Sequence, residues 1–399
     1  MIPAEDRAEG GGPPARVRRR HVFYVPGYDP RSPRTYFLLF SRELRKFAAL
    51  HGIAARMRAG KEDPSTHWHI AADWPDSPVE TVVDCLSWHE IAVRDFAVPK
   101  WRVALLSLRV LGVAIRTGTV VQMLRLNWKF GIFSLYPWAM ATLYALAALG
   151  LVAAFLALAA ALGLHPLAGL VPAALGLFGL LRLTEYLDRR FYVWYLINDW
   201  IFTWRHRTHR DPQADTRFED FARRVADAAR DPTLDEVLVI GHSSGSFVAI
   251  SVTARALELL GEAGREGPRL SLMTIGGNTP IAAAGRPETR TRRAIRNLVT
   301  DDRLFWVDYF APQDVLNFPW LDPVSAFRLD LGGRPRHNPT VRSARFREIF
   351  SAERYAELAY RFYELHFQFL RANDRHGEYE FYRFLAGPEP LESVTREPG

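Results

Sequence analysis

Residues 237–245 read Val-Leu-Val-Ile-Gly-His-Ser-Ser-Gly, an apolar run that leads into a serine flanked by glycines. The run over residues 237–240 is typical of a buried strand, and residues 244–260 return to helical spacing. A sharp strand-to-helix turn exposes the central side chain, because glycines on both sides leave room for the crowded backbone. The helix N-terminus adds positive potential where an oxyanion would form. Ser243 is therefore a candidate nucleophile, and a purely structural Gly/Ser turn is the alternative.

Strand and helix signals alternate on both sides of this turn. Helical patterns are expected over residues 33–50, 218–229 and 288–298. Apolar runs typical of strands cover residues 22–25, 270–275 and 304–310, and residues 68–72 and 81–86 are strands or partly buried loops. Such alternation predicts an α/β fold, a mostly parallel sheet with helices on both faces. Its two parts are expected over residues 21–95 and 214–385.

The two ends of the chain differ from this domain in composition. Residues 1–20 are rich in Gly, Pro and Arg and have no apolar core region, so we expect a disordered basic tail and no cleavable signal. Residues 386–399 are acidic and Pro-rich, which predicts a solvated tail.

A long uncharged stretch interrupts the α/β pattern. Residues 130–181 contain no Asp, Glu, Lys or Arg. At about 1.5 Å per residue, one helix of that length would be more than twice as long as the ~30 Å hydrocarbon core of a bilayer is thick. His165-Pro166 supplies a break, so we expect spans of about 137–162 and 167–181 in a transmembrane hairpin of about 133–183. The alternative is a buried helical hairpin, and the whole membrane insertion is assigned to residues 96–213.

The flanks of the uncharged stretch are basic and aromatic. Because positive residues favour the cytoplasmic side, both flanks are expected there and the turn at His165 outside. Residues 101–129 repeat Arg at every seventh position, which predicts an amphipathic helix on anionic headgroups or, equally, a packed helix with a solvated Arg edge. The basic residues are Arg102, Arg109, Arg116, Arg125, Lys129, Arg182, Arg189, Arg190, Arg205, Arg207 and Arg210, and the expected interfacial aromatic belt is Trp128, Tyr136, Trp138, Tyr186, Tyr192, Trp194, Tyr195, Trp200 and Trp204.

The composition narrows the classes of function. Hydrophobic residues make up 48% and charged residues 24% of 399, which excludes wholesale disorder. The net charge is +7, but the arginines are spread along the chain without a recognised motif, so no nucleic-acid partner is expected. One cysteine, Cys85, excludes a disulfide framework and a Cys-based metal cluster. No metal or organic cofactor is expected either, since H-E-x-x-H, P-loop and dinucleotide-binding patterns are absent from the sequence.

A nucleophilic serine needs an acid, a base and donors for an oxyanion. The run over residues 304–310 leads into Ala-Pro-Gln-Asp, which places Asp314 in the first turn after a strand. Asp308 inside that strand and Asp322 in a later Pro-flanked loop are the alternative acids. Asp314 is the favoured one.

The oxyanion donors are expected from two backbone amides. The first strand ends in Val-Pro-Gly-Tyr, so we assign one N–H to Tyr28, with Gly27 allowing close approach, and the other to Ser244. Two histidines are candidates for the base. His337 follows the apolar run of residues 324–331 in a Gly/Pro-rich loop, and His366 lies in a long helical pattern.

The combination of strand–Gly-His-Ser-Ser-Gly–helix, an early Pro-Gly-Tyr loop and Asp314 resembles the α/β-hydrolase superfamily, in the chain order Ser…Asp…His. Pro-Gly-Tyr stands where that superfamily typically has a Gly-rich His-Gly loop. Residues 343–346 and 365–370 resemble segments of bacterial membrane-inserted lipase- or esterase-like hydrolases, in which a His-x-x-aromatic segment supplies the base. This resemblance favours His366 over His337.

The resemblance implies a membrane-anchored serine hydrolase that acts on acyl esters, with lipid-like substrates favoured. The expected place is the bacterial inner membrane, crossed more than once, with the hydrolase domain in the cytoplasm. An acyltransferase with the same residues and a non-catalytic membrane module are the alternatives.

Overall fold

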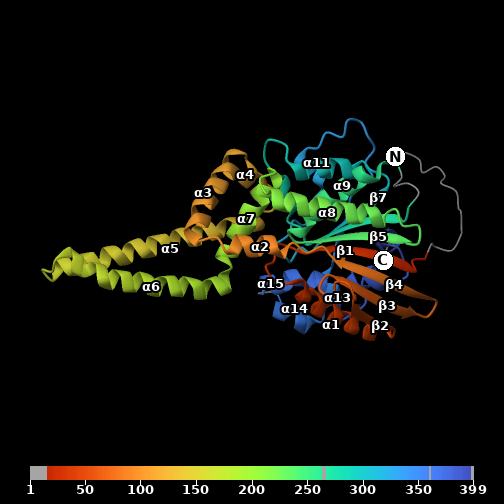
Figure 1. The fold of residues 1–399 in the computed structure, drawn as a ribbon, viewed down its shortest axis with the longest axis horizontal. Coiled ribbons are helices and arrows are strands. Elements are labelled where there is room, and N and C mark those ends of the chain that lie inside the picture. The colour runs from red at the N-terminus through yellow and green to blue at the C-terminus, as the bar shows by residue number, and fades with distance from the viewer. Residues whose placement is uncertain (1–15, 263–266, 359–360, 397–399) are drawn as a thin grey trace.

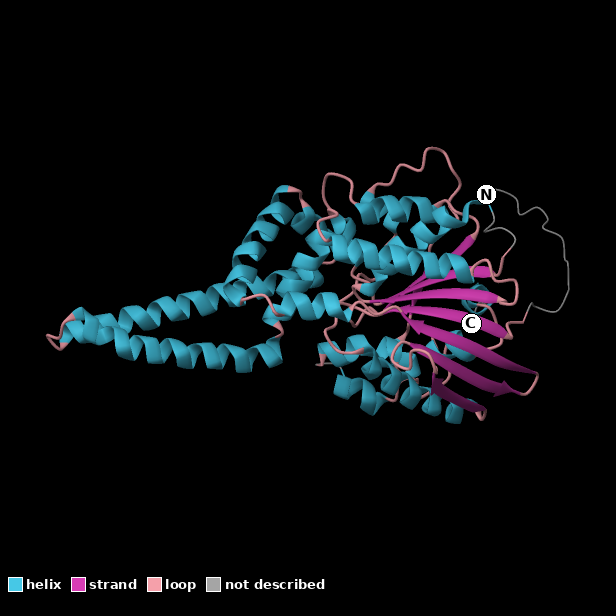
Figure 2. Cartoon of the chain, viewed as in Figure 1, coloured by secondary structure: helices cyan, strands magenta, loops and turns pink. Residues whose placement is uncertain are grey.

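The computed structural model describes residues 16–262, 267–358 and 361–396. They form an α/β body built on one sheet, from which two long helices project together as a narrow arm (Figures 1 and 2). The expected mostly parallel sheet with helices on both faces is confirmed.

The sheet has eight strands in the order β2-β3-β4-β1-β5-β6-β7-β8. Strand β3 is antiparallel to both of its neighbours, and the other adjacent pairs are parallel. The loops that follow β1, β5, β6 and β7 therefore meet at one edge of the sheet, which is where α/β proteins usually bind ligands. The strands are β1 (Arg19–Val25), β2 (Ala54–Ala59), β3 (His67–Trp74), β4 (Ser77–Cys85), β5 (Glu236–His242), β6 (Arg269–Ile275), β7 (Leu304–Phe310) and β8 (Thr340–Ser343).

Both faces of the sheet are buried, which explains the continuous apolar runs in its central strands. Along β5, Val237 and Val239 pack on one face, whereas Leu238 and Ile240 pack on the other, and all four are fully buried. The first face is covered by α2 (His89–Phe96), α8 (Pro212–Ala228), α9 (Gly245–Leu260) and α11 (Arg290–Val299). The second is covered by α1 (Pro33–His51), α13 (Phe346–Ile349), α14 (Ala352–Leu358), α15 (Phe362–His366), α16 (Phe381–Ala386) and α17 (Leu391–Arg396).

The two ends of the chain join the body more closely than expected. Strand β1 begins at Arg19, and Arg20 is fully buried, with its Nε 2.7 Å from Glu236 Oε2. The Arg20 guanidinium also donates to the carbonyl oxygens of Gly387 and Glu389. Residues 386–396 therefore pack on the domain rather than forming a solvated tail, and Arg19 and Arg20 belong to β1 rather than to the expected basic tail. Residues 1–15 and 397–399 lie outside the described part of the chain.

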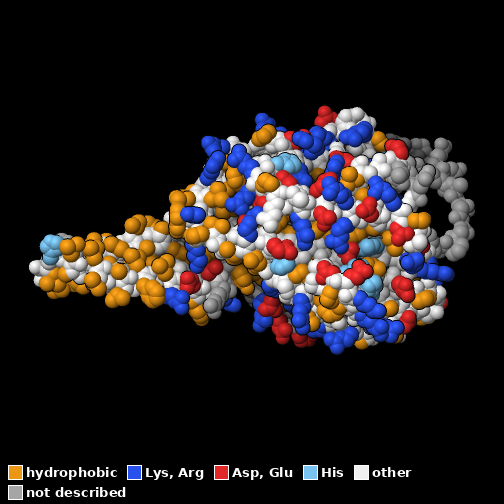
Figure 3. Space-filling view, viewed as in Figure 1, with side chains coloured by type: hydrophobic (Ala, Val, Ile, Leu, Met, Phe, Trp, Pro, Cys, Tyr) orange, Lys and Arg blue, Asp and Glu red, His pale blue; other side chains and the backbone are white. Residues whose placement is uncertain are grey.

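The projecting arm consists of α5 (Trp128–Ala161) and α6 (Pro166–Phe191). The chain breaks between them at His165, whose Nδ1 accepts from the Leu167 amide and so caps α6. Trp128–Ala161 and Leu167–Asp188 are long and apolar enough to cross a membrane. Figure 3 shows this arm covered in hydrophobic side chains, with charged groups gathered at its foot. The two expected apolar helices are confirmed as candidate spans by length and composition, and α6 extends further than predicted.

The segment before the arm is not one amphipathic helix. It forms α3 (Lys100–Arg116) and α4 (Thr119–Leu126), bent by 71°, and this pair also meets the membrane test if counted as one broken span. Val103 and Val110 are buried in a cluster shared with α7 (Val193–Arg207), whereas Trp101 is 62% exposed. The packed-helix interpretation is therefore correct for one face of α3, and the opposite face leaves large apolar side chains exposed.

Part of the expected aromatic belt faces inward. Trp200 is only 6% exposed and its ring lies 5.2 Å from that of Trp138, while the Tyr195 hydroxyl donates to the Tyr28 carbonyl. Trp128 and Tyr186 remain exposed, as interfacial residues would be. Trp200 and Phe202 of α7 thus belong to the interior, whereas Trp194 and Trp204 are partly exposed, because that helix returns from the arm and packs one face against the body.

Candidate active site

Ser243 occupies the turn between β5 and α9. Its φ is +57°, a left-handed conformation that is costly for a residue with a side chain. A Cβ on Gly241 would lie 2.6 Å from the Gly245 carbonyl oxygen, and one on Gly245 would lie 2.2 Å from the Val25 carbonyl oxygen. Both positions therefore require glycine, because neighbouring backbone atoms leave no room for a side chain. The turn leaves Ser243 partly exposed, as the sequence predicted.

The loop after β1 runs alongside this turn. A Cβ on Gly27 would be 3.2 Å from Ser243 Cβ and 3.6 Å from its Oγ. Asp29 fixes the loop, since its carboxylate accepts from Arg31 Nη2 at 2.6 Å and from the Tyr36 hydroxyl at 2.8 Å. Within the described residues, the amide N–H groups of Tyr28 and Ser244 donate to no protein acceptor.

His366 and Asp314 form a buried pair. His366 Nδ1 donates to Asp314 Oδ2 at 2.6 Å, and Asp314 Oδ1 accepts from the Leu316 amide at 2.9 Å. His366 Nε2 is buried, and the described part of the chain offers it no hydrogen-bond partner. A Cβ on Gly276 would lie 3.1 Å from His366 Cε1, so the loop after β6 also allows the imidazole close approach. The unpartnered nitrogen is the one that a general base would use.

His337 lies elsewhere. It is exposed, and its amide donates to the Val299 carbonyl oxygen. Its neighbour Asn338 donates to the carbonyl oxygen of Leu304, the first residue of β7. Because Asp314 follows the other end of β7, His337 sits at the opposite edge of the sheet. The apolar run of residues 324–331 that precedes His337 is not a strand, because most of the short helix α12 (Pro323–Phe327) lies in it.

The alternative acids also have other partners. Asp308 accepts from the Thr274 hydroxyl, and burial raises its pKa to about 6. Asp322 caps α12 through the Ser325 amide and lies 2.7 Å from Arg336. Neither carboxylate contacts a histidine among the residues that the structure describes, so Asp314 is the acid that meets a candidate base.

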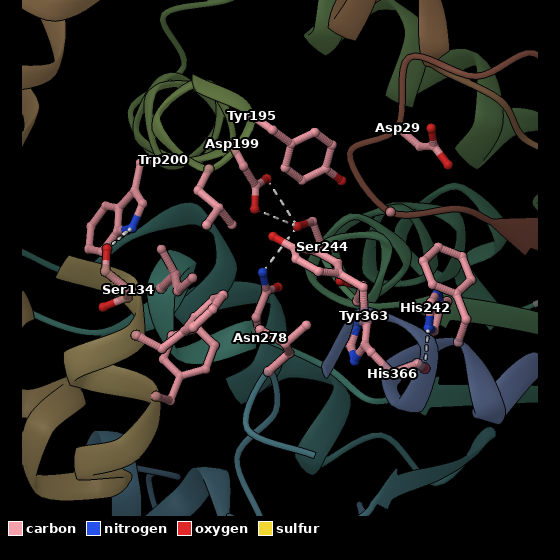
Figure 4. Close-up of a pocket in the computed structure, with 18 of the residues that line it drawn as sticks. Asp29, Ser134, Tyr195, Asp199, Trp200, His242, Ser244, Asn278, Tyr363 and His366 are labelled. Atoms are coloured by element: carbon pink, nitrogen blue, oxygen red, sulfur yellow. Dashed lines mark hydrogen bonds between the residues drawn. The ribbon is translucent and has the colours of Figure 1, made fainter. Parts of the chain in front are cut away.

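Ser243 and His366 line one pocket of about 70 Å³. Figure 4 shows its wall continuing onto α5 and α7, where Trp200 lies beside Ser134 and donates to its carbonyl oxygen at 3.2 Å. Tyr195 and Asp199 of α7 also line the pocket. The pocket therefore joins the edge of the sheet to the foot of the arm.

Asp199 is a site residue that the sequence analysis missed. The Ser244 hydroxyl lies 3.0 Å from both Asp199 oxygens and donates to them, while Asn278 Nδ2 donates to that hydroxyl at 3.0 Å (Figure 4). Burial raises the pKa of Asp199 to about 7, and the Ser244 hydrogen bond only partly opposes this. A signal existed, because Tyr195, Asp199 and Phe202 recur at the spacing of one buried helix face.

His242 packs against His366, the candidate base. Its ring centroid lies 4.8 Å from that of His366, and its Nε2 lies 3.4 Å from the His366 carbonyl oxygen. Burial, more than the nearby His366, lowers the pKa of His242 well below its usual value. His242 is thus a neutral packing partner at neutral pH.

One group of side chains has metal-ligand types. His51, His376 and Glu380 offer ligand atoms within 4.8 Å of one another. His51 Nε2 already lies 2.8 Å from Glu380 Oε2, and the group sits at the C-terminal end of α1, outside the pocket. It has no part in the geometry around Ser243.

No protein-family model, no curated protein and no solved structure matches this chain. Its function has to be inferred from the geometry of the site.

Proposed function

We propose that this chain is a membrane-anchored serine hydrolase of the α/β-hydrolase type that cleaves acyl esters. One observation carries the proposal. Ser243, held in a left-handed turn, shares a pocket with the unpartnered Nε2 of His366, whose Nδ1 is bonded to the buried Asp314. A nucleophile, a base and an orienting acid in this arrangement suit acyl transfer.

In the proposed mechanism, Ser243 Oγ attacks the ester carbonyl while His366 Nε2 takes the hydroxyl proton. Asp314 keeps the proton on Nδ1 and stabilises the imidazolium. The N–H groups of Tyr28 and Ser244 bind the oxyanion, and Gly27 leaves room for it, an effect worth about 10²–10³ in rate per donor. The alcohol then leaves with the proton from His366, and water hydrolyses the acyl-enzyme by the same route.

The membrane part of the proposal places the hydrolase domain on the cytoplasmic face of a bacterial inner membrane. Two spans and the excess of Arg and Lys at the foot of the arm support this orientation. A bilayer would also cover the exposed apolar side chains of α5 and α6.

A serine-reactive fluorophosphonate probe tests the proposal on the full chain in membranes. We expect the wild type to be labelled and Ser243→Ala to lose all labelling. Ser251→Ala is the matched control, because its hydroxyl lies on α9 and donates within that helix to Phe247. A folded wild type that resists the probe would instead identify a non-catalytic membrane module. Release of acyl groups to an added alcohol faster than to water would indicate an acyltransferase.

A further inference from the structure

A second cavity, a groove of about 660 Å³, opens beside the Ser243 pocket. It runs between the start of α1, α15 and the junction of α6 with α7. The two cavities share wall residues, so a molecule lying in the groove can extend toward Ser243. The shared residues are Asp29, Tyr36, Tyr195, Tyr363 and Phe367.

The groove lies close to the end of the second candidate span. The span Leu167–Asp188 has 22 residues, and at about 1.5 Å per residue it matches a hydrocarbon core of about 30 Å. Tyr192, which lines the groove, follows the end of that span by one helical turn, and its ring lies 4.3 Å from that of Tyr363. Leu38 in the groove wall and Phe362 beside it are 57% and 47% exposed. A bilayer around the arm would bring its headgroup layer to this opening.

Among the described residues, the groove holds one arginine that forms no ion pair. Arg31 pairs with Asp29, and Arg42 pairs with the buried Glu43. Glu364, at the rim, pairs with Arg361 at 3.2 Å.

Arg371 differs from these arginines. Within the described residues it forms no ion pair, and its Nε is buried without a hydrogen-bond partner. Burial lowers the pKa of Arg371, with partial opposition from Glu43 and Glu364. A guanidinium presents a planar fork of donors that fits a phosphate oxygen pair. Because its Nε is buried, its two terminal nitrogens are the donors that remain for an anion.

We propose that this groove binds the phosphate-bearing headgroup of a membrane lipid through Arg371 and so selects phospholipid esters as substrates. The inference rests on the proposed function. Hydrolysis would break the ester C–O bond, water giving its OH to the acyl carbon and its H to the glycerol oxygen, so the products are a fatty acid and a lysophospholipid. The substrate would enter sideways from the leaflet and leave its headgroup in the groove.

The test compares two lipids with the same acyl chains in detergent micelles, phosphatidylglycerol and diacylglycerol, by fatty-acid release from the purified full chain. We expect Arg371→Gln to lower kcat/KM for phosphatidylglycerol by about tenfold or more, mainly through KM. Its rates on diacylglycerol and on a soluble short-chain ester should not change. Arg375→Gln is the matched control, since Arg375 is exposed and lies outside the groove.

Two outcomes distinguish a failure of the headgroup site from a failure of the proposed hydrolase. Equal behaviour of Arg371→Gln and Arg375→Gln, with activity on the short-chain ester intact, would overturn the headgroup site alone. Inertness toward every ester and toward fluorophosphonate would overturn the hydrolase. In that case, binding of an ether-linked phosphatidylglycerol, measured by calorimetry, still tests the groove. The proposal requires that Ser243→Ala binds this lipid and that the double variant Ser243→Ala/Arg371→Gln binds it more weakly.

Discussion

Two buried carboxylates lie near the Ser243 turn: Asp314 in the loop after β7 of the sheet, and Asp199 on α7, the helix that follows the arm. Asp314, after β7, accepts hydrogen bonds from His366 and from the Leu316 amide. Within the part of the chain that the structure describes, Asp199 on α7 accepts only from the Ser244 hydroxyl, and burial raises its pKa to about 7. Burial favours the neutral form of a carboxylate, and at Asp199 a single hydroxyl donor opposes this only partly. Asp314 orients a histidine, whereas Asp199 exchanges a proton near neutral pH.

Removing the base on the sheet side should have the largest effect. We expect His366→Ala to lower kcat for ester hydrolysis by about 10⁵- to 10⁶-fold, because in the proposed mechanism His366 takes the Ser243 proton. His337→Ala should retain the wild-type rate, since His337 lies at the opposite edge of the sheet. Steady-state hydrolysis of a soluble ester measures both. A larger loss in His337→Ala than in His366→Ala would reverse the assignment.

Replacing the carboxylate of Asp314 should have the second-largest effect on the rate of ester hydrolysis. Asp314→Asn is expected to lower kcat by about 10⁴-fold, since an amide in that place favours the wrong imidazole tautomer. Asp308→Asn is the comparison, because that buried carboxylate meets Thr274 and no histidine within the described chain. The same ester assay at neutral pH applies, and equal rates for the two variants would contradict the role of Asp314.

The turn between the two sides should be sensitive to a single methyl group. Gly245→Ala puts a Cβ 2.2 Å from the Val25 carbonyl oxygen and 2.5 Å from that of Pro26. We expect the free energy of unfolding to fall by about 3 kcal/mol or more. Gly112→Ala, in the open part of α3, should instead raise it by about 0.5–1 kcal/mol. Thermal unfolding in detergent compares them, and a tolerated Gly245→Ala would show that β1 and α9 can separate.

Replacing Asp199 should have the smallest effect, and this effect is a change in how stability depends on pH. Because the pKa of Asp199 is about 7 in the folded state and near 3.8 in the unfolded chain, folding retains a proton that the unfolded chain releases between these values. Wild-type stability should therefore fall as pH rises from about 4 to 7. In Asp199→Asn, the loss of stability that comes from the Asp199 proton should be absent.

Unfolding midpoints at pH 5 and pH 8 measure the difference. We expect the wild-type midpoint to fall by about 2 °C or more beyond the fall in Asp199→Asn. Asp220→Asn, an exposed position on α8, serves as the control and should follow the wild type. Parallel curves for the wild type and Asp199→Asn would mean that Asp199 is ionised throughout.

The central strands and the serine turn could be predicted because their signals are local. Residues 304–310 match β7, and the glycines around Ser243 are required by backbone contacts next to them. Strand β2 was not predicted, since Ala-Ala-Arg-Met-Arg-Ala lacks the β-branched residues typical of strands. Strand β8 has only four residues, which is too short for an alternating pattern to be recognised.

The histidine and the second carboxylate depend on contacts between distant parts of the chain. Local pattern alone favoured neither His337 nor His366, and the resemblance of residues 365–370 favoured the one that meets Asp314. Asp199 lies in an aromatic segment that is equally suited to a membrane surface. Only the return of α7 against the body turns that segment inward, and no local pattern specifies this packing.

The position of the insertion in the chain also has a consequence for biosynthesis. Strand β1 pairs with β4 on one side and with β5 on the other, while the arm and α7 lie between β4 and β5 in the sequence. A ribosome thus delivers half of the sheet first and then both spans, before the strand that completes β1 exists. During that interval the unpaired edge of β1 is open to other nascent chains. Rapid entry of the arm into a bilayer would shorten this exposure.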